Sequence, residues 1–358
     1  MSPTLVTGGT GFLGRHLVGA LAARGTPVRV LARATSDTGG LDGVGGVELV
    51  RGDITRRDDL QRAIEGCERV FHVAAETRDE LPREVYRAAN HDAVETLLEL
   101  CFAAGVQRVV HTSSYFAMGR TGPPRNAEGF VADEYWTHDP DDFHGPLEES
   151  KYDAEHAVNQ QVSAGKPVFA VVPTMIYGPE ARPVSRLEGL AHGNRIVRLL
   201  AEHAAGRGAG LPGDGRQLWN LVHVQDVVAG HLAAMDAGDP SGKWPPPRWT
   251  HWHMILGGEN IAVSDLFARF SRLAGVPPPK PAATGGFFGK MFGAGRKAGK
   301  ERSAMDGHSW AYTSAMAGSD FGYRSRPLDE GLAQTVEWMA RCGLVKAGSG
   351  GRSPASKA

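Results

Sequence analysis

The chain has 358 residues, and its 39 lysines and arginines almost balance its 40 aspartates and glutamates, which gives a net charge of −1. Proteins that bind nucleic acid or anionic membranes usually carry an excess of positive charge. The near-neutral net charge therefore argues against both kinds of partner, and no nucleic-acid partner is expected. No apolar run approaches the roughly 18 residues that a transmembrane helix needs. At roughly 150 residues per domain, the length predicts two lobes.

The cysteines, histidines and first residues bear on compartment and metal binding. Cys67, Cys101 and Cys342 lie far apart without a C-x-x-C pair, which suits a reducing compartment and argues against a disulfide scaffold or a cysteine zinc site. The histidines form neither an H-E-x-x-H motif nor a compact His/Asp cluster, so no metal site is predicted. No targeting segment is visible, and the expected location is the cytoplasm or another reducing compartment.

The first 175 residues alternate short, valine-rich apolar segments with amphipathic ones, which is typical of a parallel sheet with helices on both faces. The apolar segments fit buried parallel strands, predicted at 4–7, 28–32, 47–51, 69–73, 107–112 and 168–172. Leu13, Leu17 and Leu21 recur at helical spacing and predict a helix after the first strand. The longest helix of this half is predicted over 85–104.

The second half has longer loops and a less regular alternation. Strands are predicted around 220–224 and 253–256, with helices between them. The basic segment 287–300 carries phenylalanines and several glycines, which weaken a helix and predict a loop. A last helix is predicted over 328–342, and the polar tail 346–358 is predicted to be disordered.

The strongest motif is Thr7-Gly8-Gly9-Thr10-Gly11-Phe12-Leu13-Gly14, which follows the first predicted strand and opens the first helix. A pyrophosphate needs backbone N–H donors at a helix N-terminus and a chain path without obstructing Cβ atoms. Gly8 permits the tight turn, Gly11 lets the backbone approach the phosphates, and Gly14 lets helix and strand pack closely. Phe12 and Leu13 complete the predicted cofactor-binding loop, whose alternative is a glycine-rich turn without a ligand.

The end of the second strand indicates which dinucleotide binds. An acidic residue there bonds the ribose 2′-OH of NAD, whereas an arginine accommodates the 2′-phosphate of NADP. The segment 28–33 has no acid and ends in Arg33, and the first acid after it is Asp37. NADP(H) is therefore predicted over NAD(H), with a solvated loop charge as the alternative role of Arg33.

Further motifs follow along the chain: Gly52-Asp53-Ile54-Thr55, His72-Val73-Ala74-Ala75, Asn90, Thr112-Ser113-Ser114, Ser150-Lys151, Pro173-Thr174-Met175-Ile176-Tyr177-Gly178-Pro179 and Val222-His223-Val224-Gln225-Asp226-Val227. With them, the chain resembles an extended short-chain dehydrogenase/reductase, most of all the dihydroflavonol-reductase-like group and plant farnesol-dehydrogenase-like proteins. The resemblance implies an α/β fold with a Rossmann-type doubly wound parallel sheet and a smaller C-terminal substrate lobe. The predicted division is an NAD(P)-binding core over 1–175, a mainly substrate-binding lobe over 176–345 with segments returning to the core, and the tail 346–358.

The resemblance implies contacts to the adenosine half of the cofactor. Asp53 and Ile54 would border the adenine, and Ala74 and Ala75 would line the path of the ribose and phosphates. The alternative role of Asp53 is a loop cap.

The resemblance also implies an active site at the nicotinamide end. Ser114 would hydrogen-bond the substrate oxygen, and Lys151 would hold the nicotinamide ribose hydroxyls. Pro173 and Ile176 would lie near the nicotinamide carboxamide, and Asn90 would support the active-site side of the sheet. The alternative roles are a strand-end hydroxyl for Ser114 and a solvated helix charge for Lys151.

One position departs from the family pattern, in which a tyrosine stands four residues before the lysine and exchanges the proton at the substrate oxygen. Counting back four from Lys151 gives Leu147, and leucine cannot transfer a proton. Three substitutes remain open. Tyr152 lies about 100° round the helix, Tyr115 faces the opposite side if its strand persists, and His144 comes within reach if the helix begins late.

The resulting prediction is an oxidoreductase of the short-chain dehydrogenase/reductase type that acts on a small lipophilic alcohol or carbonyl, of farnesol, flavonoid or sterol kind. The alternative is a dinucleotide-binding protein with impaired catalysis, because Leu147 replaces the tyrosine, serving as a structural or regulatory subunit. Homodimer formation and a place in a larger assembly are both left open.

Overall fold

A computed structural model describes residues 2–41, 43–121, 130–207, 210–237, 243–246, 253–279 and 307–345. The loop predicted over 287–300 and the tail predicted over 346–358 lie outside the described residues. Within the described part of the chain, no helix is both long and apolar enough to cross a bilayer.

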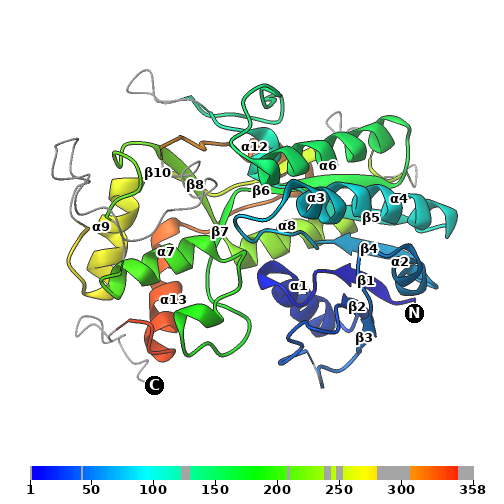
Figure 1. Ribbon diagram of the computed structural model, residues 1–358, viewed down its shortest axis with the longest axis horizontal. Helices are drawn as coiled ribbons and strands as arrows, with labels where there is room; N and C mark the ends of the chain where they lie inside the picture. Colours follow the sequence, from blue (N-terminus) through cyan, green and yellow to red (C-terminus); the bar gives the residue numbers. More distant parts are fainter. Residues whose placement is uncertain are drawn as a thin grey trace.

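The main sheet has seven parallel strands in the order β3-β2-β1-β4-β5-β6-β9 (Figure 1). Their bounds are Thr4–Thr7 for β1, Val28–Ala32 for β2, Val47–Arg51 for β3, Arg69–His72 for β4, Arg108–Thr112 for β5, Val168–Pro173 for β6 and His253–Leu256 for β9. Strand β1 pairs with β2 on one side and with β4 on the other, so the strand order reverses between β1 and β4. This confirms the predicted Rossmann-type sheet, in which such a reversal opens a crevice at the carboxyl ends of the strands.

Helices cover both faces of the main sheet, and its inner strands are therefore largely buried and apolar on both sides, whereas the edge strand β3 is partly exposed (Figure 1). The covering helices are α1 (Phe12–Ala23), α2 (Arg57–Ile64), α4 (Ala93–Ala103), α6 (Pro146–Ser163) and α8 (Val224–Asp236). Helix α1 packs against α8 on one face, and α4 packs against α2 and α6 on the other. Two apolar clusters lie between these helices and the sheet, one around Leu17 and Val171 and one around Leu97 and Val109.

The helix predicted over 85–104 is present as a continuous helical segment over 83–103, but it contains a π turn that the sequence does not predict. It consists of α3 (Arg83–Arg87), the π-helical turn η1 (Ala88–Asp92) and α4. The π turn holds the buried Asn90, whose side chain bonds the backbone of Glu76 and the hydroxyl of Ser150. Because these partners come from other parts of the fold, the spacing of apolar residues along the chain cannot predict the π turn that they favour.

A second, smaller sheet has the strand order β10-β8-β7. The remaining elements are β7 (Met175–Tyr177), η2 (Leu187–Gly189), α7 (Arg195–Ala204), β8 (Leu218–His223), β10 (Glu259–Ala262), α9 (Val263–Ala274), α12 (Ala315–Phe321) and α13 (Leu328–Arg341). The strand predicted over 220–224 ends at His223 because its imidazole accepts the N–H of Gln225 and starts α8. Strand β9 joins the main sheet beside β6, and the division of the chain at residue 175 stays a prediction.

Candidate cofactor and substrate site

The glycine-rich loop after β1 is a turn that admits little beyond glycine at two positions. Gly8 has a φ of 70°, and a Cβ there would lie 2.6 Å from the backbone nitrogen of Ala74. A Cβ at Gly14 would overlap the carbonyl oxygen of Gly8. The N–H of Gly11 donates to the same carbonyl at 2.9 Å and closes the turn. The loop therefore follows the tight path that the sequence predicts, between the ends of β1 and β4.

The N-terminus of α1 has the character of an anion site. Gly11 is its N-cap, and no side chain caps the free N–H groups of the first turn. The helix dipole adds partial positive charge at this end, and the first turn carries no acidic residue. The backbone of this loop fits the pyrophosphate of a dinucleotide, which would accept hydrogen bonds from the N–H groups around Phe12 and Leu13.

A cavity of about 210 Å³ extends from this loop to α6. Of the residues predicted to bind cofactor or substrate, it is lined by Gly8, Gly11, Phe12, Leu13, Gly14, Ala75, Ser114, Lys151, Pro173 and Ile176. The structure thus brings both ends of the predicted site, the phosphate loop and the Ser114–Lys151 pair, to one continuous hollow.

Four predicted cofactor residues lie outside this cavity. The carboxylate of Asp53 accepts the N–H and the hydroxyl of Thr55, both at 2.9 Å, as a loop cap does. Ile54 packs against the apolar cluster around Leu97, and Arg33 is exposed after β2. Ala74 stands directly behind Gly8. Their contacts to a cofactor stay predictions.

Ser114 lies just beyond the end of β5 and starts the short helix α5 (Tyr115–Met118). Its hydroxyl oxygen accepts the N–H of Phe116 at 3.2 Å, which fixes the side chain and leaves its O–H to donate to a substrate oxygen. Tyr115 would face away from the site only if the strand continued to it, but β5 ends at Thr112 and Tyr115 lines the cavity. Burial raises the pKa of the Tyr115 phenol well above its ordinary range.

Helix α6 places Leu147 and Lys151 one turn apart in the same cavity. Leu147 is fully buried, and Lys151 is 6% exposed. Burial lowers the pKa of Lys151 to about 8, because a charged ammonium loses its hydration there, while the more distant carboxylate of Glu155 raises it.

The first turn of α6 is fixed by a chain of hydrogen bonds. The hydroxyl of Ser150 donates to the carbonyl of Leu147 at 2.8 Å, and Asn90 donates to that hydroxyl at 2.9 Å. Asn90 in turn accepts the N–H of Glu76 at 2.7 Å. The π turn η1 therefore ties the chain after β4 to the helix that carries Lys151.

The other two substitutes for the missing tyrosine do not reach this cavity. Tyr152 lines a separate cavity of about 670 Å³ together with His156, whose ring lies 4.5 Å from the Tyr152 ring. His144 donates its N–H to Glu148 at 2.7 Å, and its ring lies 4.9 Å from that of His308. Neither Tyr152 nor His144 lines the smaller cavity.

Sequence reasoning missed one wall of the cavity, formed by Thr77, Gly193, Arg195 and Ile196. Arg195 lies at the start of α7 and donates to the carbonyl of Thr77 at 2.6 Å and to the carboxylate of Asp79 at 2.7 Å. This contact joins α7 to the loop after β4. No motif marks these positions, so only the folded chain reveals them.

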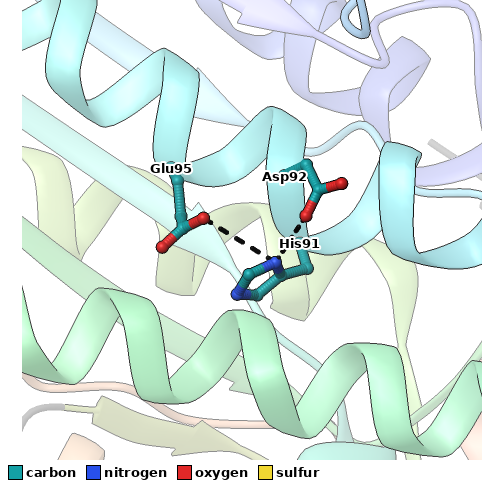
Figure 2. A group of neighbouring side chains, drawn as sticks. All are labelled: His91, Asp92 and Glu95. Atoms are coloured by element: carbon teal, nitrogen blue, oxygen red, sulfur yellow. Dashed lines mark hydrogen bonds and ion pairs between the residues drawn. The ribbon is translucent and has the colours of Figure 1, made fainter.

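The expectation that no compact His/Asp cluster forms is also wrong. His91, Asp92 and Glu95 gather on η1 and α4 (Figure 2), the only group of three close metal-type ligands among the residues that the structure describes. The imidazole Nδ1 lies 2.8 Å from the Asp92 carboxylate and 3.8 Å from that of Glu95. Both carboxylates are about half exposed, the hydrogen bond between His91 and Asp92 accounts for the closest contact, and no metal is assigned to the cluster.

The chain matches the NAD dependent epimerase/dehydratase family over residues 4–244. It therefore belongs to this family of extended short-chain dehydrogenases/reductases, as the sequence motifs predict. The fold and family define an oxidoreductase class that binds a nicotinamide dinucleotide.

Among similar proteins, "Sterol demethylase protein B" of Methylococcus capsulatus is 35% identical over 78% of this chain and 76% of its own length. A Synechocystis protein assigned by name to dihydroflavonol 4-reductase is 30% identical over 95% of both chains. The human sterol-4-alpha-carboxylate 3-dehydrogenase, decarboxylating, is 29% identical over 71% of this chain and 66% of its own length.

Two solved structures resemble the whole chain. The structure of gox2253 is 30% identical, with a TM-score of 0.75 over 97% of this chain and 100% of that one. MoeE5, solved in complex with UDP-glucose and NAD, is 25% identical, with a TM-score of 0.69 over 95% of this chain and 99% of that one.

Proposed function

We propose that the protein is an NADP(H)-dependent oxidoreductase acting on a small lipophilic alcohol or carbonyl of sterol, flavonoid or farnesol kind. The observation that carries this proposal is the cavity that joins the phosphate loop to Ser114 and Lys151. Its lining is largely apolar, with Phe116, Met175 and Ile196 beside the polar groups. The names of the sterol-acting and flavonol-acting relatives support the lipophilic substrate class.

The preference for NADP(H) is supported by the charges around the end of β2. Asp37, the first acid after this strand, lies 3.3 Å from Arg182 and 3.7 Å from Arg15, so its carboxylate is already engaged by cations. The Arg33 side chain is exposed directly after β2, the strand end at which an arginine of this fold accommodates a 2′-phosphate. An arginine can bond a phosphate with two parallel N–H groups.

The chain's own residues would act on the substrate as follows. The bound nicotinamide supplies or accepts the hydride. The Ser114 hydroxyl donates a hydrogen bond to the substrate oxygen and orients the reacting carbon, while apolar side chains such as Leu147 exclude water. Pro173 and Ile176 form the wall beside the predicted carboxamide position.

Calorimetry tests the cofactor part of this proposal. We expect NADPH to bind more tightly than NADH by about 1.5–3 kcal/mol, the range of hydrogen bonds to charged groups, which is roughly a 10- to 150-fold difference in Kd. Arg33→Ala should remove most of this preference. Arg24→Ala is the matched control, because Arg24 lies at the opposite end of α1 and pairs with Asp236 at 2.8 Å. Equal affinities in the unmutated protein would reject the role of Arg33.

Turnover of a panel of sterol, flavonoid and prenyl alcohols and carbonyls tests the catalytic part. Oxidation or reduction of at least one class, followed by NADPH absorbance, is the expected result. The relatives described above carry the names of enzymes and lend no support to the alternative of a non-catalytic subunit, which predicts binding without turnover. Failure to bind either dinucleotide would reject the proposed function altogether.

A further inference from the structure

We propose that Lys151 is itself the proton donor and acceptor at the substrate oxygen, the role for which Leu147 has no chemical group. This inference rests on the proposed oxidoreductase function and adds the identity of its acid and base.

Only three titratable side chains line the cavity among the described residues: Tyr115, Lys151 and Arg195. Arg195 is bound to Thr77 and Asp79, and a guanidinium does not release its proton in a protein. The Tyr115 ring is buried against Trp310 at 5.1 Å, and its burial holds the phenolic proton more tightly than in water. Lys151 is the remaining group that can both give and take a proton.

The ammonium of Lys151 is also available for this task. Within the part of the chain that the structure describes, its nitrogen makes no hydrogen bond and no ion pair with a protein atom. A buried charge without a partner is costly, and this cost lowers the pKa of Lys151 to about 8. A proton-transfer group works best when its pKa lies near the working pH.

The groups facing Lys151 from the surrounding elements do not titrate in the same range. Burial, with the charge of Lys151 as a further cause, lowers the pKa of His72 on β4 to about 3 and also lowers the pKa of His111 on β5. Both imidazoles are therefore neutral above pH 7. Glu155 follows one turn later on α6 and contributes a negative charge, and Arg195 contributes a constant positive one.

The proposed step balances as follows in the direction of reduction. The substrate carbonyl carbon takes the hydride supplied by a reduced nicotinamide dinucleotide, and the carbon–oxygen π electrons move to the oxygen. An N–H bond of the Lys151 ammonium breaks and an O–H bond forms, which yields the alcohol and a neutral amine. The amine then regains a proton from solvent, and oxidation follows the same steps in reverse.

Lys151→Arg is the central variant because it keeps the positive charge and replaces the ammonium with a guanidinium, which does not release its proton. We expect turnover to fall by about 10²- to 10⁴-fold, the usual contribution of a positioned acid. The Kd for the dinucleotide should change by less than about threefold, because the charge near the ribose is kept. Lys166→Arg, an exposed lysine on the loop before β6, is the matched control and should leave turnover unchanged.

The pH dependence provides a second measurement. The kcat for reduction should be constant below about pH 8 and fall above it, with the opposite trend for oxidation. Adding Leu147→Tyr to the Lys151→Arg variant supplies a phenol beside a fixed positive charge, and this double variant should regain turnover with a shifted pH profile.

A readout independent of turnover is the NMR titration of ¹⁵N-lysine-labelled protein, with Lys151→Met to assign the signal. A Lys151 signal that titrates near pH 8 supports the proposal, and one that stays protonated beyond pH 10 overturns it. Loss of turnover in Tyr115→Phe with retention in Lys151→Arg would make the phenol the donor. A protein that binds NADPH but turns over no compound of the panel overturns this inference, whereas absence of binding rejects the proposed function beneath it.

Discussion

Replacing Lys151 by methionine should stabilise the protein without its cofactor. Methionine fills a similar volume and carries no charge. The pKa of Lys151 falls from 10.5 to about 8 in the folded chain, which corresponds to about 3 kcal/mol of destabilisation in the protonated folded protein, at about 1.4 kcal/mol per pKa unit. Below pH 8 both the folded and the unfolded chain carry this proton, so the wild type bears the full cost at pH 7.

The sign of the pH dependence follows from proton binding. Between pH 8 and 10.5 the unfolded chain keeps the proton on Lys151 while the folded chain loses it, so the unfolding free energy of the wild type rises with pH. The advantage of Lys151→Met should therefore shrink from about 3 kcal/mol at pH 7 to about 1 kcal/mol at pH 9.5.

Urea unfolding of both proteins at these two pH values measures the effect. Lys166→Met is the control, because Lys166 is exposed and its replacement should change the unfolding free energy by no more than about 0.5 kcal/mol at either pH. Equal stabilities of Lys151→Met and the wild type at pH 7, or a difference that does not change with pH, would refute the reasoning.

Two further predictions concern the cofactor loop and the buried histidines. Gly11→Val should abolish binding of both NADPH and NADH in calorimetry. The valine Cβ would lie 3.2 Å from the Gly8 carbonyl oxygen, and its methyl groups would occupy the path of the phosphates. Unchanged Kd values would exclude this loop as the pyrophosphate site. Acidification should destabilise the fold, since burial lowers the pKa of His72 to about 3 and that of His231 to about 4 while the unfolded imidazoles take up protons near pH 6.5. Each should cost about 2 kcal/mol between pH 7 and 5 in urea unfolding, and a stability that does not fall over this range would contradict the burial argument.

The main sheet could be predicted because its determinants are local. The segments 28–32 and 47–51 are strands with the predicted bounds, because the valine-rich pattern that predicts each strand lies within the segment itself. The edge strand β3 differs from a fully covered strand in carrying the exposed Glu48 and Arg51. The helix predicted over 85–104 is present, but its π turn was not predicted. Its π turn depends on Asn90 meeting Glu76 and Ser150, and these contacts exist only in the folded chain.

In the candidate site, too, residues fixed by a local pattern could be predicted, and residues fixed by distant contacts could not. The roles of Gly8 and Gly14 were predictable, because the turn and the close approach that require glycine lie within one short segment. The spacing of Leu147 and Lys151 likewise placed both on one helix face. The position of Tyr115 was left conditional on the strand continuing past Thr112, and β5 ends there as predicted. Arg195 was missed because its partners lie far back along the chain.

The π turn at Ala88–Asp92 acts as a spacer of fixed length between the two halves of the site. A π turn holds more residues than an α turn, so the helix before it is rotated relative to the helix after it. Removing one residue here would allow a regular helix, yet it would turn the preceding residues by about 100° and carry Asn90 away from Ser150. Asn90 would then no longer connect the segment after β4 with helix α6, which carries Lys151. The π turn interrupts the regular α-helix, and this irregularity lets Asn90 hold the segment after β4 and helix α6 in their relative positions.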